Sequence, residues 1–287
     1  MQSILPYSQK HKIAMFNTET KQSIKRFIAK STKPFFDKND KNLSVILNYH
    51  SIHPTHKYST IPDDFVQQME YLSANFKILS LADFYEIRNA GNKSPERIAV
   101  ITFDDGYEDN YEYAFPVLKK LGIKATIFLT TGFINGEVDI TKKDSVYNGL
   151  KPLKWEQILE MRANGITFGS HTHTHPILTK FSLEDAEREI IHSKGIMEGK
   201  LNESVEMFAY PLGQPKTFNS SIIGLLKNRG FKLACTSLWG HVNSNTDAYA
   251  LPRIRIDACD SLNDFKEKVN GRWDFIRWFQ NLRALIS

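Results

Sequence analysis

The chain has 287 residues, of which 41% are hydrophobic and 24% are charged, and its formal net charge is +5. This composition is that of an ordinary globular protein and excludes disordered, collagen-like and other fibrous chains. The charge excess is small and no aromatic-interleaved basic motif accompanies it, so we expect no nucleic-acid partner. The two cysteines, Cys235 and Cys259, are too few for a zinc ribbon or a disulfide scaffold.

The sequence carries no recognisable targeting or membrane-spanning segment. The first residues, MQSILPYSQKHKIAMF, lack the continuous apolar stretch of a signal peptide. No run of about 18 apolar residues occurs along the chain. We therefore expect a cytoplasmic protein.

Strand and helix patterns alternate after a lysine-rich segment at residues 1–42, in which KQSIKRFIAK has the composition of a short basic helix. We expect strands at 43–50, 97–103, 124–131, 166–170, 205–210, 231–237 and 251–258. We expect helices at 62–76, from Ser80 to Gly91, at 110–122, at 155–165, from Ser182 onward and at 219–230. This order predicts a parallel sheet covered by helices, and about seven repeats favour a closed βα barrel over an open doubly wound sheet.

Unusual polar residues follow several of the expected strands. In a βα barrel, catalytic residues gather where the strands end. Here those positions hold His50, the pair Asp104–Asp105, the run SHTHTH and the segment YPLG. Adjacent residues of an extended segment point in opposite directions, so one aspartate can bind a metal while the other acts as a base. A strand-to-helix turn with a capping aspartate is the competing interpretation of this pair.

Three histidines, His171, His173 and His175, alternate with threonines in the second cluster. They share one face of an extended segment, whereas on a helix only His171 and His175 pair, and the following Pro176 argues against a regular helix. Two imidazoles and one carboxylate leave open positions on a divalent metal, an arrangement that activates water. With Asp105 on another strand end, this interpretation is stronger than that of a polar turn with satisfied histidines.

On these residues the chain resembles the polysaccharide deacetylase family, also called the NodB-homology or carbohydrate esterase family 4 domain. TFDDG matches the first family motif, which implies that Asp104 is the general base and Asp105 a metal ligand. HTHTH matches the motif His-[Ser/Thr]-x-x-His, which implies that His171 and His175 complete the metal site and that His173 lies outside it. The resemblance also implies a distorted (β/α)7–8 barrel and a divalent metal, zinc ahead of cobalt, nickel or iron.

The third family motif is altered in this sequence. In FAYPLG, Ala209 stands where the family commonly has arginine, and Leu212 where it has an aromatic residue. The Leu212 N–H can still serve in an oxyanion hole, because a backbone donor does not depend on the side chain; we place Tyr210 with it as a substrate-binding residue. Arg253, in LPRI, is the candidate to orient Asp104, and an exposed arginine flanking a strand is the alternative.

The family's late Leu-x-His motif, which carries the general acid, is absent, since no histidine follows LPRIRI. His50 matches the N-terminal histidine that takes this role in the poly-N-acetylglucosamine deacetylase subgroup, whose FAYPxG and LPRI segments are also similar. A buried, hydrogen-bonded histidine is the alternative for His50. The resemblance therefore implies a metal-dependent hydrolase that removes the N-acetyl group of an amino sugar in a glycan or glycan precursor, releasing acetate.

The resemblance covers residues 43–258, which we expect to form the catalytic domain. Residues 1–42 are then a basic N-terminal extension, and residues 259–287 an amphipathic helical tail. The aromatic, basic stripe of that tail predicts a helix that packs on its own domain or lies on a membrane surface. Two other functions remain open from the sequence: an amidohydrolase of the same fold that acts on a non-sugar C–N bond, and a non-catalytic sugar-binding relative.

Overall fold

The computed structural model describes residues 20, 22–31, 44–91, 96–142 and 145–286. Within these ranges the strands form a single sheet in the order β7-β6-β5-β4-β3-β1-β8, in which every neighbouring pair is parallel, and β2 pairs with β3. The strands are β1 (Val45–Tyr49), β2 (Lys77–Leu79), β3 (Ile98–Phe103), β4 (Thr126–Leu129), β5 (Thr167–Ser170), β6 (Met207–Ala209), β7 (Leu233–Cys235) and β8 (Ile254–Arg255).

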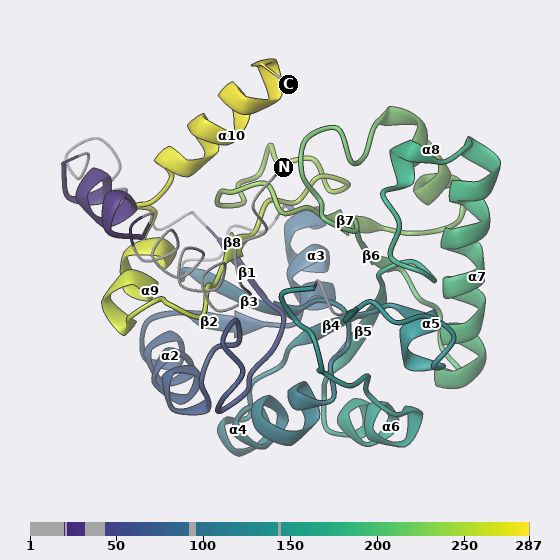
Figure 1. Cartoon of the computed structure of the whole chain (residues 1–287), viewed down its shortest axis with the longest axis horizontal. Coiled ribbons are helices and arrows are strands. Elements are labelled where there is room, and N and C mark those ends of the chain that lie inside the picture. Colours follow the sequence, from purple (N-terminus) through teal and green to yellow (C-terminus); the bar gives the residue numbers. More distant parts are fainter. Residues whose placement is uncertain (1–19, 21, 32–43, 92–95, 143–144, 287) are drawn as a thin grey trace, which may run out of the picture.

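Helices connect the strands and surround the sheet, as Figure 1 shows. They are α2 (Pro62–Asn75), α3 (Leu81–Asn89), α4 (Phe115–Leu121), α5 (Thr131–Ile134), α6 (Trp155–Ala163), α7 (Leu183–Leu201), α8 (Ser220–Asn228), α9 (Leu262–Val269) and α10 (Phe275–Ile286). A π-helical turn (Asn110–Ala114) precedes α4, and a 3-10 turn (Leu178–Lys180) precedes α7.

The sheet curls into a distorted ring that the segment 251–255 closes. Leu251 forms a parallel bridge with Cys235 of β7, and its N–H donates to the carbonyl of Ala234 at 3.0 Å. Three and four residues later, Ile254 and Arg255 pair with β1 on the other side of the gap. The predicted distorted (β/α) barrel is thereby confirmed.

Each predicted strand and helix contains an observed one, although most strands are shorter than predicted. Ser80 caps α3 by accepting a hydrogen bond from the Asp83 N–H at 3.0 Å, and Gly122 ends α4 with φ 64°. The helix predicted at 110–122 begins with a π-helical turn. Pro116, at the start of α4, has no backbone N–H and so cannot donate the i to i−4 hydrogen bond of a regular α-helix. The sequence did not predict β2, which has only three residues, or the short helix α5.

Alternate residues of the strands face two separate apolar clusters. Ile46, Val100 and Phe128 belong to the smaller cluster, while their neighbours Leu47 and Ile101 belong to the larger one that the helices cover. This period of two follows from the pleat of a strand. Residues at the positions of the smaller cluster therefore point into the barrel, and this direction determines which side chains can meet at its end.

A helical segment at residues 22–31 and the segment around α9 and α10 pack against the rest of the protein. Residues 22–31 are helical, and Gln22 donates to Asp260 at 2.8 Å while Arg26 forms an ion pair with Asp264 of α9. Trp273, just before α10, is fully buried. Helix α10 then extends outward (Figure 1) and leaves part of its surface exposed. The division of the chain at residues 42 and 258 stays a prediction.

No helix within the described ranges combines the length and the hydrophobicity that crossing a membrane requires.

Candidate active site

All the polar strand ends that the sequence singled out lie at one end of the barrel, because parallel strands share their carboxyl edge. Asp104 and Asp105 follow β3, and the histidine segment follows β5. Several non-glycine residues at this end have backbones in the left-handed region, among them Asp105 (φ 74°), Thr172 (φ 68°), His175 (φ 60°) and Leu212 (φ 61°). Such strained conformations require support from the surrounding structure and cluster at functional sites.

Asp105, His171 and His175 form a compact cluster of metal-ligand type. Their ligand atoms lie within 4.8 Å of one another. Oδ1 of Asp105 is 3.5 Å from Nε2 of His171 and 3.4 Å from Nε2 of His175. That oxygen is buried and accepts no hydrogen bond within the described ranges. A buried carboxylate oxygen without a donor, facing two imidazole nitrogens, fits a divalent metal such as zinc.

The tautomer and charge of His171 also suit a ligand. Its Nδ1–H donates to the carbonyl of Ala209 at 2.8 Å, which leaves the lone pair on Nε2 directed at the cluster. Burial lowers the pKa of His171 to about 4, so the imidazole is neutral at pH 7. A neutral imidazole is the form that binds a metal.

Asp104 lies beside this cluster and is held by Arg253. The two terminal guanidinium nitrogens donate to the two carboxylate oxygens, each at 2.7 Å, and Arg253 Nε donates to the carbonyl of Thr236 at 2.8 Å. Arg253 is 1% exposed, which excludes the alternative of an exposed arginine. Burial alone raises the pKa of Asp104, but the charge and hydrogen bonds of Arg253 hold that pKa well below its usual value. Asp104 is therefore an ionised carboxylate of fixed orientation.

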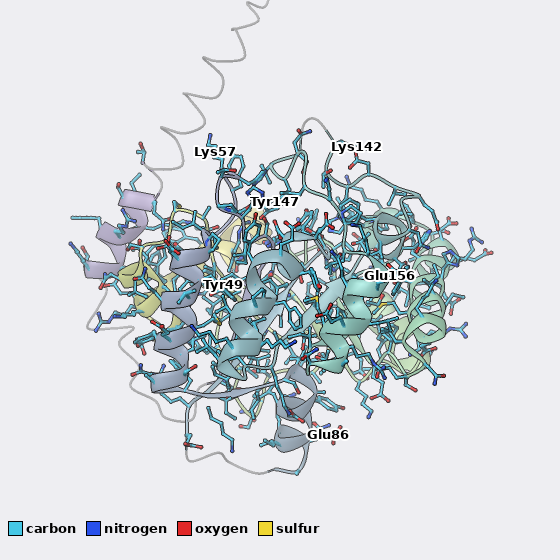
Figure 2. All side chains as sticks on the ribbon, turned by 90° about the horizontal axis from the view of Figure 1, so that it is seen from below. Tyr49, Lys57, Glu86, Lys142, Tyr147 and Glu156 are labelled. Carbon is cyan, nitrogen blue, oxygen red and sulfur yellow. The ribbon has the colours of Figure 1, made fainter. Side chains whose placement is uncertain are left out.

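His50 follows β1 at the same end of the barrel, where its ring stacks on Tyr147 with centroids 5.4 Å apart. Burial lowers the pKa of His50, while the charges of Asp105 and Asp104 act in the opposite direction. Tyr147 also stacks on His56, with ring centroids 6.1 Å apart. In the view of Figure 2, Tyr147 lies toward the same end of the molecule as Lys57 and Lys142, opposite Glu86.

Asp109 and Asn110, in the segment that follows β3, bind the backbone around His50. Asn110 donates to the carbonyl of His50 at 2.9 Å. Asp109, which is buried, accepts hydrogen bonds from the hydroxyl of Ser51 and from the N–H of Ile52. Asp109 and Tyr147 were not predicted from the sequence, because neither belongs to a motif and their contacts depend on how distant loops meet.

The segment after β6 holds the two predicted substrate-contacting residues, Tyr210 and Leu212. The side chain of Tyr210 is buried in the larger apolar cluster, stacks on Phe218 and donates to the carbonyl of Tyr249 at 3.0 Å. Ala209 faces into the barrel, so the side chain of the next residue, Tyr210, points away from the barrel interior. A contact of Tyr210 with substrate stays a prediction. The Leu212 N–H donates to no group among the described residues, which leaves it available to a substrate oxygen.

His173 points away from the cluster, as the family motif implies. Its Nε2 lies 3.0 Å from a carboxylate oxygen of Glu137, and its Nδ1 lies 3.0 Å from the hydroxyl of Thr131. The three alternating histidines therefore do not act as equivalent ligands.

Residues 91–234 match the family model described as polysaccharide deacetylase. The YxkH protein of Bacillus subtilis is 30% identical over 212 residues, which cover 74% of this chain and 70% of that protein. The chain belongs to the polysaccharide deacetylase family.

Other members of this family are similar over most of their length. The poly-beta-1,6-N-acetyl-D-glucosamine N-deacetylase of Staphylococcus epidermidis is 29% identical over 263 residues, covering 83% of this chain and 85% of that protein. The solved structure of the deacetylase PplD of Streptococcus pyogenes, in complex with acetate, has a TM-score of 0.69 and 26% identity, covering 79% of this chain and 98% of that one. The solved structure of IcaB from Ammonifex degensii has a TM-score of 0.68 and 24% identity, covering 81% of this chain and 97% of that one, and supports the shared fold.

Proposed function

We propose that this polysaccharide deacetylase family member hydrolyses the N-acetyl group of an amino sugar in a glycan or glycan precursor and releases acetate. The observation that carries the proposal is the buried cluster of Asp105, His171 and His175 beside an aspartate that Arg253 orients. A substrate with N-acetylglucosamine units is favoured, because the staphylococcal relative that spans 83% of this chain is named as a deacetylase of such a polymer.

Asp105, His171 and His175 are the residues that would hold the metal, and their one oxygen and two nitrogen donors favour zinc while also suiting cobalt, nickel or iron. When bound, the metal supplies Lewis-acid polarisation and makes water a better nucleophile at neutral pH.

We assign the proton transfers to Asp104 and His50. Asp104 is ionised and fixed, so it can accept a proton from the water that attacks the acetyl carbonyl. The Leu212 N–H donates to the oxyanion that forms on the carbonyl oxygen, a contribution typically worth about 3–4 kcal/mol. His50, protonated for this step, gives its proton to the sugar nitrogen as the C–N bond breaks. The products are acetate and a free amino group.

The reaction is tested by measuring acetate release from N-acetylglucosamine oligomers with metal-loaded protein, with chelator-treated protein and after metal is restored. We expect activity that disappears with the chelator and returns with the metal. The absence of acetate release by metal-loaded protein from every acetylated amino-sugar substrate would contradict the proposal.

We also propose that α10 makes a peripheral membrane contact. Trp278, Phe279 and Leu282 on this helix are 62%, 41% and 40% exposed, and aromatic and leucine side chains of this kind enter the boundary between headgroups and acyl chains. We expect co-sedimentation with anionic vesicles, because the chain carries a net charge of +5, and a weaker interaction for the double variant Trp278→Ser, Phe279→Ser. Equal sedimentation of both proteins would contradict this contact.

A further inference from the structure

The loop that carries the two metal-site histidines is anchored by helix α7 on the side away from the barrel axis. Glu189 of α7 accepts a hydrogen bond from the His173 N–H at 3.0 Å and one from the Thr174 N–H at 2.8 Å. Its other carboxylate oxygen accepts from the Thr174 hydroxyl, also at 2.8 Å. One side chain thus binds both N–H groups immediately before His175.

A second anchor lies one helical turn further along α7. The hydroxyl of Ser170, the residue before His171, donates to the hydroxyl of Ser193 at 2.9 Å, and both side chains are buried. Residues four apart on a helix share one face, so Glu189 and Ser193 lie on the same side of α7. This face therefore fixes the chain immediately before each of the two histidines.

The loop needs such support because its backbone is strained. Thr172 and His175 have φ values of 68° and 60°, which cost free energy in residues other than glycine. Helix α5 supplies a further contact, since the Gly132 N–H donates to the carbonyl of His173 at 2.8 Å. The charged acceptor Glu189 is the strongest of these contacts, because hydrogen bonds to an ionised group are about twice as strong as neutral ones.

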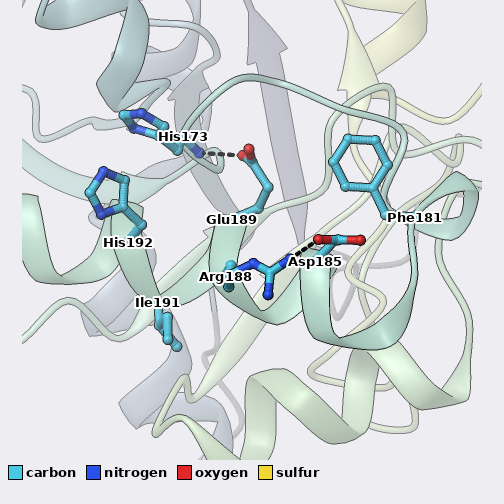
Figure 3. Close-up of a pocket in the computed structure, with 7 residues that line it drawn as sticks. All are labelled: His173, Phe181, Asp185, Arg188, Glu189, Ile191 and His192. Atoms are coloured by element: carbon cyan, nitrogen blue, oxygen red, sulfur yellow. Dashed lines mark hydrogen bonds and ion pairs between the residues drawn. The ribbon is translucent and has the colours of Figure 1, made fainter.

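Figure 3 shows this arrangement from the side of a cavity of about 580 Å³, which Glu189 lines together with His173, Asp185 and Arg188. Asp185 and Arg188 pair with each other, whereas the carboxylate of Glu189 points toward the backbone of His173. Glu189 is thus committed to the loop and not to its charged neighbours on α7.

We propose that Glu189 is a positioning residue for the metal site: by holding the N–H groups of residues 173 and 174, it keeps His175 in the conformation that joins His171 and Asp105. This inference rests on the proposed metal dependence. Glu189 does not itself reach the ligand atoms, which are those of the cluster described above.

The test measures zinc affinity by competition with a chromophoric chelator, and the visible absorption spectrum of the Co²⁺-loaded protein, for Glu189→Ala and Glu189→Gln. We expect zinc affinity to fall by about tenfold or more in Glu189→Ala, the usual scale for residues that support metal ligands, with an altered Co²⁺ spectrum. Glu189→Gln keeps one acceptor oxygen, so we expect its zinc affinity to lie between those of Glu189→Ala and the parent. The matched control is Glu187→Gln, since Glu187 lies on the same helix and pairs with Arg229 at the surface.

Parent-like zinc affinity and an unchanged Co²⁺ spectrum in both Glu189 variants would overturn the inference while leaving the proposed function intact. A parent protein that binds zinc but releases no acetate would overturn the proposed function alone. If Glu189→Ala does not fold, Thr174→Val removes one of the three donors to Glu189, and we expect a smaller loss of affinity in the same direction. An unchanged affinity in Thr174→Val and Glu189→Gln together would also reject the positioning role.

Discussion

Arg253 and Asp104 form a buried, bidentate ion pair in which both N–O distances are 2.7 Å. Arg253 lies in the segment 251–255 that closes the ring of strands, and Asp104 directly follows β3. The two residues are 149 positions apart in the sequence, and Arg253 also donates to Thr102 at 3.1 Å. Ring closure at residues 251–255 is what brings them together. The pair therefore links the geometry of the barrel to the orientation of the proposed base.

Replacing Arg253 should damage both activity and stability. Arg253→Lys keeps the charge but cannot bind both oxygens, and we expect kcat/KM to fall by about 100-fold, the scale of a misplacement of about 1 Å. Arg253→Met leaves a buried carboxylate unpaired, and we expect the free energy of unfolding in urea to fall by about 3–5 kcal/mol. Arg162→Lys, which alters an ion pair at the surface, is the control. Parent-like kcat/KM in Arg253→Lys would refute the orienting role.

Substitutions within the histidine segment should separate ligands from neighbours. Asp105→Asn and His175→Ala remove a proposed ligand, so we expect loss of bound zinc and of acetate release. His173→Ala removes contacts to Glu137 and Thr131 but no ligand, so we expect zinc to remain. Metal content after dialysis is the measurement. Zinc lost from His173→Ala but kept by His175→Ala would require a different ligand assignment.

The sequence was sufficient to predict the barrel and to predict that Asp105, His171 and His175 lie together, because these residues follow apolar strands whose ends converge in any parallel barrel. It was not sufficient to predict Tyr147 or Glu189. Their contacts depend on how a loop and a helix pack over the strand ends, and no local pattern encodes that packing. The side-chain direction of Tyr210 was not predicted, although its position after the inward-facing Ala209 was a usable signal.

Tyr147 should influence the protonation step through His50. Removing the stacked ring in Tyr147→Leu frees the imidazole to rotate, while His50→Gln removes its proton altogether. We expect kcat to fall by about 10²–10⁴ in His50→Gln, the range for a general acid, and by less in Tyr147→Leu. Substrates whose leaving amine is less basic should be less affected, since they need less protonation. An equal loss for good and poor leaving groups would contradict the assignment of His50 as the acid.

Asp109 should make the stability of the protein pH-dependent. Burial raises the pKa of Asp109 to about 7, against about 3.9 in an unfolded chain. The folded protein therefore holds this proton more tightly, and the stabilisation is fully present below about pH 4 and is lost as the pH rises through about 7. Asp109→Asn mimics the neutral form at every pH. The free energy of unfolding of Asp109→Asn minus that of the parent should therefore increase between pH 4 and pH 8, because only the parent loses this stabilisation.

Urea unfolding of the parent and of Asp109→Asn at several pH values across that window measures this difference. The control is Asp63→Asn on the exposed surface of α2, whose difference from the parent should not follow the same curve. A constant difference between Asp109→Asn and the parent across the window would show that this carboxyl is ionised throughout, with its hydrogen-bond donors outweighing its burial.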